Sequence, residues 1–132
     1  MIGLDTHVLM RALLAEQGDE GMRARGLLAV RCSPAEPAFL NHVVLCEAAW
    51  VMARTYRYSR EQILEAFTAI LATPAFLVAD RMLVEEALRV FRTTRADFAD
   101  ALVGVLNRRA GCTTTYTFDR RAAETTEFSI VG

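Results

Sequence analysis

Short apolar segments alternate along the chain with longer segments in which apolar residues recur every three or four positions. The short segments predict strands at 1–4, 38–40, 75–78, 113–118 and 128–131. The longer ones predict helices from Thr6 to a break at Gly18, over 20–30, 42–57 and 59–72, from Asp80 to Arg92, from Asp97 to Ala110, and over 120–124. Strands that alternate with helices are typical of a parallel sheet covered on both faces, so we expect an α/β fold.

Side chains that cap helices support these boundaries. Asn41, Asp80 and Asp97 each stand where a predicted helix begins, and Ser59 with Gln62 forms a capping-box pattern. Gly111 is suited to end the helix that Asp97 opens.

The length of 132 residues and the absence of a linker predict one domain over 1–132. The longest uncharged run, 66–79, contains Pro74 and is too short to span a bilayer. No signal-like segment follows Met1, and the three cysteines have neither zinc nor disulfide spacing. We therefore expect a cytoplasmic protein with no membrane contact.

The charge balance excludes some chemistry. The net charge is −1, and all 15 basic residues are arginines. Without lysine, Schiff-base catalysis, the P-loop phosphate grip and the receiver-type lysine are excluded. Clustered arginines can still bind phosphate.

Glu47 is the only charged residue in a long apolar helical stretch. An isolated buried carboxylate is costly, so such a residue either pairs with an arginine, for example Arg54, or binds a metal ion. Trp50, one turn away on the same helix, is expected in the core.

Two aspartates follow predicted strands. Asp5 comes directly after the first strand, and Asp119 follows the strand at 113–118. The carboxyl ends of parallel strands meet at one edge of a sheet, where open α/β folds place their sites. The alternative for Asp5 is that it only caps the next helix.

Asp97 and Asp100 lie three residues apart at the start of a helix, and therefore on one face. Asp97 can serve as the helix cap, and Asp100 can interact with the helix dipole. Either role is an alternative to metal binding.

Together, these acids form an all-oxygen set of possible ligands, which favours Mg²⁺ or Mn²⁺ over zinc. Such cations neutralise phosphodiesters and activate water, so a metal-dependent nuclease is the leading hypothesis. Dehalogenase-type phosphatases need a second Asp where this chain has His7, and receivers need adjacent acids and a lysine.

Four segments resemble the signature blocks of PIN domains and, more narrowly, of the toxin ribonucleases of VapBC-type toxin–antitoxin systems. They are Leu4-Asp5-Thr6-His7-Val8-Leu9, Val44-Leu45-Cys46-Glu47-Ala48-Ala49-Trp50-Val51, Asp97-Phe98-Ala99-Asp100-Ala101-Leu102-Val103 and Thr117-Phe118-Asp119-Arg120. The resemblance covers residues 1 to about 123.

This resemblance implies a three-layer α/β/α fold with a small central parallel sheet, Mg²⁺- or Mn²⁺-dependent cleavage of RNA, and a homodimer held by a cognate antitoxin. It implies a catalytic tetrad of Asp5, Glu47, Asp100 and Asp119, all candidate metal ligands, with Asp97 as a fifth. Thr6 and Thr117 match hydroxyl positions that would hydrogen-bond the carboxylates. His7 stands where the family more often has Asn; it could orient Asp5, contact phosphate or only begin the helix.

Several arginines near these blocks are candidate RNA contacts, although each could equally be a solvated surface charge. They are Arg11, Arg92, Arg95, Arg120 and Arg121. Leucines of the first two helices, together with Met22, could form a groove for an antitoxin helix, or could simply belong to the core.

Three functions remain open at this stage. The chain is a toxin ribonuclease, a PIN-type nuclease of RNA maturation or decay without an antitoxin, or a degenerate module that binds RNA or protein. The complete acidic set argues against the third.

Overall fold

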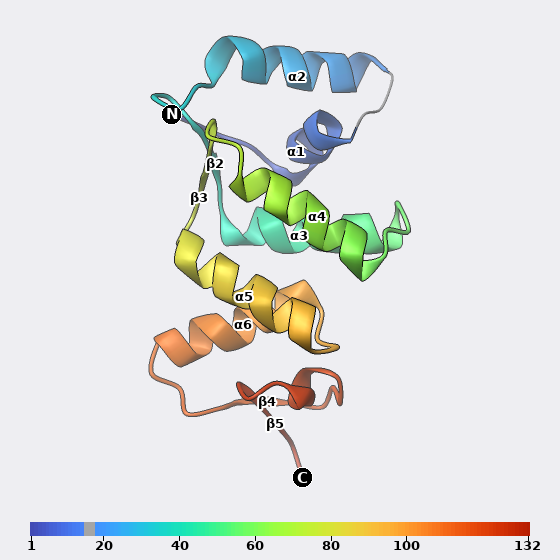
Figure 1. The fold of residues 1–132 in the computed structure, drawn as a ribbon, viewed down its shortest axis with the longest axis vertical. Coiled ribbons are helices and arrows are strands. Elements are labelled where there is room, and N and C mark those ends of the chain that lie inside the picture. Colours follow the sequence, from blue (N-terminus) through green and yellow to red (C-terminus); the bar gives the residue numbers. More distant parts are fainter. Residues whose placement is uncertain (15–17) are drawn as a thin grey trace. The chain divides into compact units, whose positions relative to one another are not determined.

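The computed structural model describes residues 1–14 and 18–132. The chain divides into two compact units, Met1–Ala79 and Asp80–Gly132. Each unit combines helices with parallel strands (Figure 1), so the predicted α/β class is confirmed. The single domain over 1–132 stays a prediction.

The first unit has a three-stranded parallel sheet with β2 in the middle. Ile2 lies opposite Ala38, and Ala38 lies opposite Phe76. In chain order the elements are β1 (Ile2–Gly3), α1 (Thr6–Leu13), α2 (Asp19–Arg31), β2 (Ala38–Leu40), α3 (His42–Arg54), α4 (Arg60–Leu71) and β3 (Phe76–Val78).

Two strands of this sheet lead into their helices in the same way. Asp5 follows β1, and its Oδ1 accepts the N–H of Val8 at 2.9 Å; Asn41 follows β2, and its Oδ1 accepts the N–H of Val44 at 2.9 Å. These N-caps satisfy donors that the first helical turn leaves unpaired. They fix Asp5 at the carboxyl edge of the sheet, as predicted.

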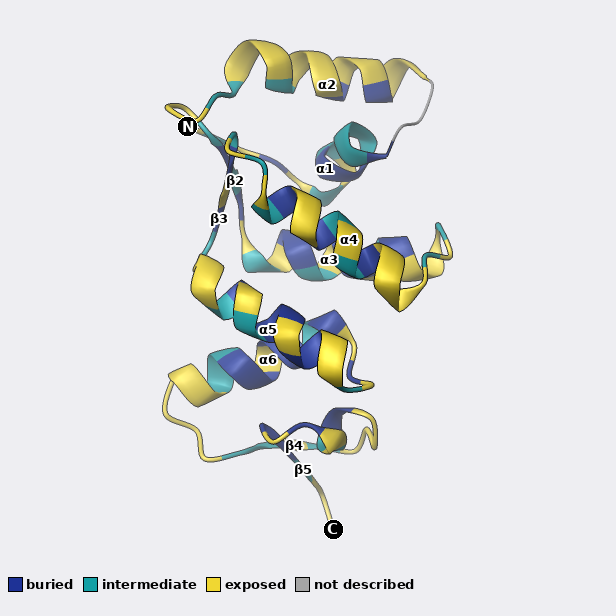
Figure 2. Ribbon diagram, viewed as in Figure 1, coloured by how far each residue is buried: buried dark blue, intermediate teal, exposed yellow. Residues whose placement is uncertain are grey.

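The core of the first unit is made by α1, α3, α4 and β2. Leu9, Leu40, Leu45, Met52 and Phe67 are fully buried. Helix α2 differs, because its buried residues are only Gly21 and Ala24 (Figure 2). Its apolar Met22, Leu27 and Val30 are exposed.

The second unit consists of α5 (Arg81–Thr93), α6 (Phe98–Arg109), β4 (Thr115–Thr117), the 3₁₀ helix η1 (Ala122–Glu124) and β5 (Phe128–Ile130). Helix α5 packs along α6, and β4 pairs in parallel with β5, Thr115 opposite Phe128. A Cβ at Gly104 of α6 would lie 2.6 Å from Phe128 and 2.8 Å from Glu127. Glycine at position 104 therefore allows the start of β5 to pack this closely against α6.

One helix end and one helix cap differ from the prediction. The helix predicted to reach residue 57 ends at Arg54, because Arg57 has a φ of 56°, in the left-handed region that a right-handed helix excludes. Asp80 stands at the N-cap of α5 but makes no capping hydrogen bond, because its own φ of 43° is also left-handed.

The burial predicted around Glu47 is wrong. Helix α3 buries Val44, Leu45, Ala48, Ala49 and Met52. The opposite face, defined by Val43, Glu47, Trp50 and Arg54, is exposed, and Trp50 retains 57 % of its accessible surface. Trp50 is therefore not a core residue, and Glu47 lies on an exposed face.

In the described residues, no helix is long and apolar enough to cross a membrane. Helix α1 ends at Leu13, and the rest of the segment predicted to be helical up to Gly18 includes 15–17, which lie outside the described residues.

Candidate metal centre

The first unit joins two predicted site residues through a threonine. Thr6, the first residue of α1, donates its hydroxyl to Oε1 of Glu47 on α3 at 2.8 Å. Asp5, the neighbour of Thr6, is held by its cap bond to Val8. Glu47 is thus oriented by Thr6 rather than by Arg54, whose guanidinium carbon instead lies 4.9 Å from the centre of the Trp50 ring.

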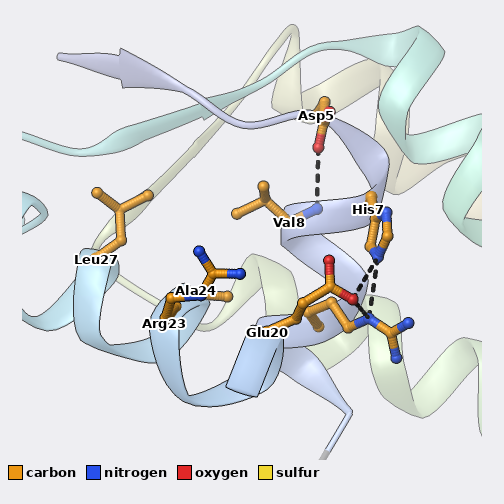
Figure 3. Close-up of a pocket in the computed structure, with 8 residues that line it drawn as sticks. Asp5, His7, Val8, Glu20, Arg23, Ala24 and Leu27 are labelled. Carbon is orange, nitrogen blue, oxygen red and sulfur yellow. Dashed lines mark hydrogen bonds and ion pairs between the residues drawn. The ribbon is translucent and has the colours of Figure 1, made fainter. Parts of the chain in front are cut away.

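A pocket of about 300 Å³ opens beside Asp5, between α1 and α2 (Figure 3). The Nε of Arg11 donates to Nε2 of His7 at 3.0 Å. The Glu20 carboxylate lies 3.6 Å from the same nitrogen and 3.5 Å from Nε of Arg11. His7 and Arg11 are therefore parts of a charged network on the pocket wall.

The second unit brings three predicted aspartates within electrostatic reach of one another. Burial raises the pKa of the Asp100 carboxyl, and the negative charges of Asp97 and then Asp119 raise this pKa further. Asp97 caps α6, because its Oδ1 accepts the N–H of Asp100 at 2.7 Å. The capping role predicted for Asp97 is confirmed, and it places Asp97 beside Asp100.

A tight turn after β4 holds Asp119. Its Oδ1 accepts the N–H groups of Arg121 at 2.8 Å and Ala122 at 3.4 Å. Its own N–H donates to Oγ1 of Thr117 at 2.9 Å. Thr117 therefore supports the backbone of Asp119 and not its carboxylate, the partner that the family resemblance implies.

Among the arginines predicted to contact RNA, Arg95 and Arg11 bind acidic side chains. Nε of Arg95 donates to Oε2 of Glu124 at 2.8 Å, and NH2 of Arg95 forms a second ion pair with the same carboxylate. Arg92, Arg120 and Arg121 have exposed side chains.

The donor chemistry of these residues fits Mg²⁺ or Mn²⁺. Each predicted ligand is a carboxylate, and hard divalent cations prefer oxygen ligands. Burial and then the charges of Asp97 and Asp119 raise the pKa of Asp100, and a bound cation would relieve the repulsion between these carboxylates. Among the described residues, no group of three or more His, Cys, Asp or Glu side chains lies close enough together to hold a metal ion.

Sequence reasoning missed three charged residues near these groups: Glu20, Arg23 and Glu124. Glu20 and Arg23 lie three residues apart on α2 and line the pocket beside Asp5. Their spacing places them on one helical face, but the contact with α1 is tertiary. Glu124 follows Asp119 by five residues, and its partner Arg95 is 29 residues away.

Comparison with known proteins places the chain in a family. The sequence profile of the PIN domain matches residues 2–127, a range that spans both units. The chain is also similar to a VapC ribonuclease from Aquifex aeolicus (strain VF5), with 25 % identity over 118 residues, which are 89 % of this chain and 87 % of the relative. The match extends over the strand ends and the helices that carry all five acids, and the chain therefore belongs to the PIN domain family.

Proposed function

We propose that this PIN-domain protein is a divalent-metal-dependent endoribonuclease, and that the acids of both units serve one reaction. The observation that carries the proposal is the grouping of Asp97, Asp100 and Asp119 in the second unit, where burial and then the charges of the other two aspartates raise the pKa of Asp100. Carboxylates that repel one another destabilise a fold unless a cation is bound. Membership of the PIN family and the ribonuclease named among its relatives support this proposal.

In the first unit, Asp5 and Glu47 have separate tasks. Asp5 uses Oδ1 for its helix cap and is a candidate metal ligand. Glu47 accepts the Thr6 hydroxyl at Oε1, and this bond fixes its orientation. We assign Glu47 as the group that accepts a proton from the attacking water, with Thr6 as its positioning residue.

In the second unit, Asp100 and Asp119 are the ligands to be expected, with Asp97 as a fifth acid. The cap bond from Asp97 and the turn around Asp119 restrict two of these carboxylates before any ligand binds. A bound Mg²⁺ or Mn²⁺ would neutralise charge on the scissile phosphate and lower the pKa of a water molecule.

The first experiment incubates purified protein with total RNA, with Mg²⁺ or Mn²⁺ or with chelator, and maps the cut ends. We expect cleavage only with the metal, and ends without a 2′,3′-cyclic phosphate, because water rather than the 2′-hydroxyl is the nucleophile. Cleavage that persists fully in chelator would refute the proposal.

The control variants are Asp19→Asn and Glu85→Gln, one in each unit, which remove exposed carboxylates paired with Arg23 and Arg81. Both should cleave RNA as the unaltered protein does. If they lost as much activity as Asp5→Asn, general loss of negative charge would explain the result instead.

We further propose that this nuclease is a cytoplasmic toxin, dimeric, and inhibited by an antitoxin. The similarity to a protein named VapC ribonuclease supports the assignment, and exposed Met22, Leu27 and Val30 on α2 offer an apolar surface for a partner helix. A small reading frame directly upstream of the gene would support the toxin role, and co-expression with its product should yield a stable, inactive complex. If the chain cleaves RNA yet binds no such product, the nuclease belongs instead to RNA maturation or decay.

A further inference from the structure

The exposed end of α3 combines an indole with a guanidinium. Trp50 is 57 % exposed, although tryptophan is among the most costly side chains to leave in water. The guanidinium of Arg54 lies over its ring, 4.9 Å from the centroid. The ring is thus held by a cation–π contact on one side, while much of its surface remains open to solvent.

The turn that follows α3 extends this surface with positive charge. Residues 50–60 contain three arginines and no acid. Arg54, Arg57 and Arg60 are all exposed, and Tyr56 and Tyr58 stand between them with ring centroids 6.3 Å apart. Aromatic rings interleaved with arginines are typical of surfaces that bind single-stranded nucleic acid.

A protein partner fits this face less well. The exposed face of α3 alternates apolar and charged side chains, namely Val43, Glu47, Trp50 and Arg54. Trp, Tyr and Arg are frequent in protein–protein interfaces, but Glu47 lies within this face, and the buried centres of such interfaces are depleted in acidic residues. An indole can stack on one RNA base, and the neighbouring guanidinium can contact the phosphate of that nucleotide.

We propose that Trp50, Arg54 and Arg57, which we call the Trp50 platform, bind single-stranded RNA, with one base stacked on the indole. This inference rests on the proposed function, because Trp50 and Arg54 lie on the same exposed face of α3 as Glu47, Trp50 one turn away from it, and Arg57 follows in the turn after the helix. The base on Trp50 would be a neighbour of the scissile phosphate, and Arg57 would contact the backbone. Every base has a π face, so the platform sets the register of RNA rather than its sequence.

The chain itself supplies the probe for this proposal, because Trp50 is its only tryptophan. In chelator, where the proposed cleavage is silent, a short oligouridylate is titrated into the full chain while tryptophan emission is recorded. Stacking should quench the emission, and an abasic ribose-phosphate oligomer of the same length should not. The free protein should show the emission maximum of an indole in contact with water.

Variants then give the affinity. By anisotropy of labelled oligouridylate, Trp50→Ala should bind about ten-fold more weakly, and Trp50→Phe should recover most of the loss. Trp50→Leu should not, because it keeps apolar bulk without a ring face. Val43→Ala, on the same exposed face, is the matched control and should bind like the unaltered chain, while Arg57→Gln should lower the salt dependence by about one ion.

Failure of this inference can be told apart from failure of the proposed function. If metal-dependent cleavage occurs but RNA binding leaves the emission unchanged, or Trp50→Leu binds RNA as tightly as Trp50→Phe, the platform is refuted and the nuclease stands. A blue-shifted emission in the free protein, or a changed oligomeric state in Trp50→Ala, would show that Trp50 packs against protein and would also overturn the platform. If cleavage is absent in every metal, the proposed function fails.

Discussion

The acids of the two units differ in the charges around them. In the first unit, the Val8 N–H donates to Asp5 and the Thr6 hydroxyl donates to Glu47. In the second unit, backbone N–H groups also hold Asp97 and Asp119, but burial and the charges of these two aspartates raise the pKa of Asp100.

The first unit therefore shows how the carboxylates are oriented, and the second shows the energetic cost of ionising one of them. The carboxylates of the first unit are oriented without a metal, because their partners donate hydrogen bonds and carry no charge. Asp100 is penalised when ionised, so the fold of the second unit bears a cost that a cation or a proton removes. The stability of the second unit should therefore depend on metal more strongly than that of the first.

We expect the greatest loss of activity from Asp5→Asn and Asp100→Asn, one variant in each unit. Both should lower RNA cleavage by about 10³-fold, which corresponds to about 4 kcal/mol of transition-state stabilisation. In chelator their stabilities should diverge. Asn caps helices as well as Asp does, so Asp5→Asn should leave the Tm unchanged, whereas Asp100→Asn should raise it by removing a penalised charge.

The ionisation of Asp100 should make the metal-free protein less stable as the pH rises. Its folded-state pKa lies above the unfolded value, so the stability linked to its protonation is full below the unfolded pKa and is lost as the pH rises through the folded pKa. Thermal unfolding of the metal-free protein at acidic and neutral pH checks this. A lower Tm for Asp100→Asn than for the unaltered chain at neutral pH would contradict the contrast between the units.

A second prediction concerns packing. Gly104→Ala would place a Cβ 2.6 Å from Phe128 Cε2, so we expect a loss of about 2–3 kcal/mol in the free energy of unfolding. Gly26→Ala on α2 is the matched control, because its Cβ would meet nothing within 4 Å, and it should stabilise the chain by up to about 1 kcal/mol. Denaturant unfolding measures both, and equal effects would disprove the close approach of β5 to α6.

The third prediction tests orientation in the first unit. Thr6→Val removes the hydroxyl that holds Glu47 and should lower kcat about five- to ten-fold, while Thr6→Ser keeps it and should retain activity. Mn²⁺ affinity should stay constant in both variants. A drop in Mn²⁺ affinity with unchanged kcat would instead make Thr6 part of the metal site.

The smallest expected effect comes from the ion pair of Arg95 and Glu124. It links the loop before Asp97 to the 3₁₀ helix after Asp119. If the pair positions the aspartates, Arg95→Gln and Glu124→Gln should each weaken Mn²⁺ binding by about two- to five-fold. If only the net charge mattered, Arg95→Gln would bind Mn²⁺ more tightly, because a positive charge is lost. Calorimetry distinguishes this from positioning of the aspartates by the ion pair. Arg92→Gln, which removes the same charge, is the control.

Local signals explain why much of the fold could be predicted. Asn41, Ser59 with Gln62, and Asp97 act on their own helix within one turn, so their caps were visible in the sequence and are present in the structure. The placement of Asp5 after a strand is local in the same sense.

Other features depend on distant contacts. Which face of α3 is buried is decided by its neighbours, so an almost wholly apolar helix gave no sign that Trp50 is exposed. The left-handed backbone of Asp80 and the Arg95–Glu124 pair likewise have no local pattern. The repulsion around Asp100 needs the turn of Asp119 to lie near α6, which spacing alone does not give.

The most direct measurement is a calorimetric titration of Mn²⁺ into the unaltered chain, Asp5→Asn and Asp100→Asn, all checked for folding. We expect each substitution, although the two residues lie in different units, to weaken Mn²⁺ binding by at least about ten-fold. If Asp5→Asn binds Mn²⁺ with unchanged affinity and stoichiometry while Asp100→Asn does not, the acids of the two units do not serve one metal-dependent reaction.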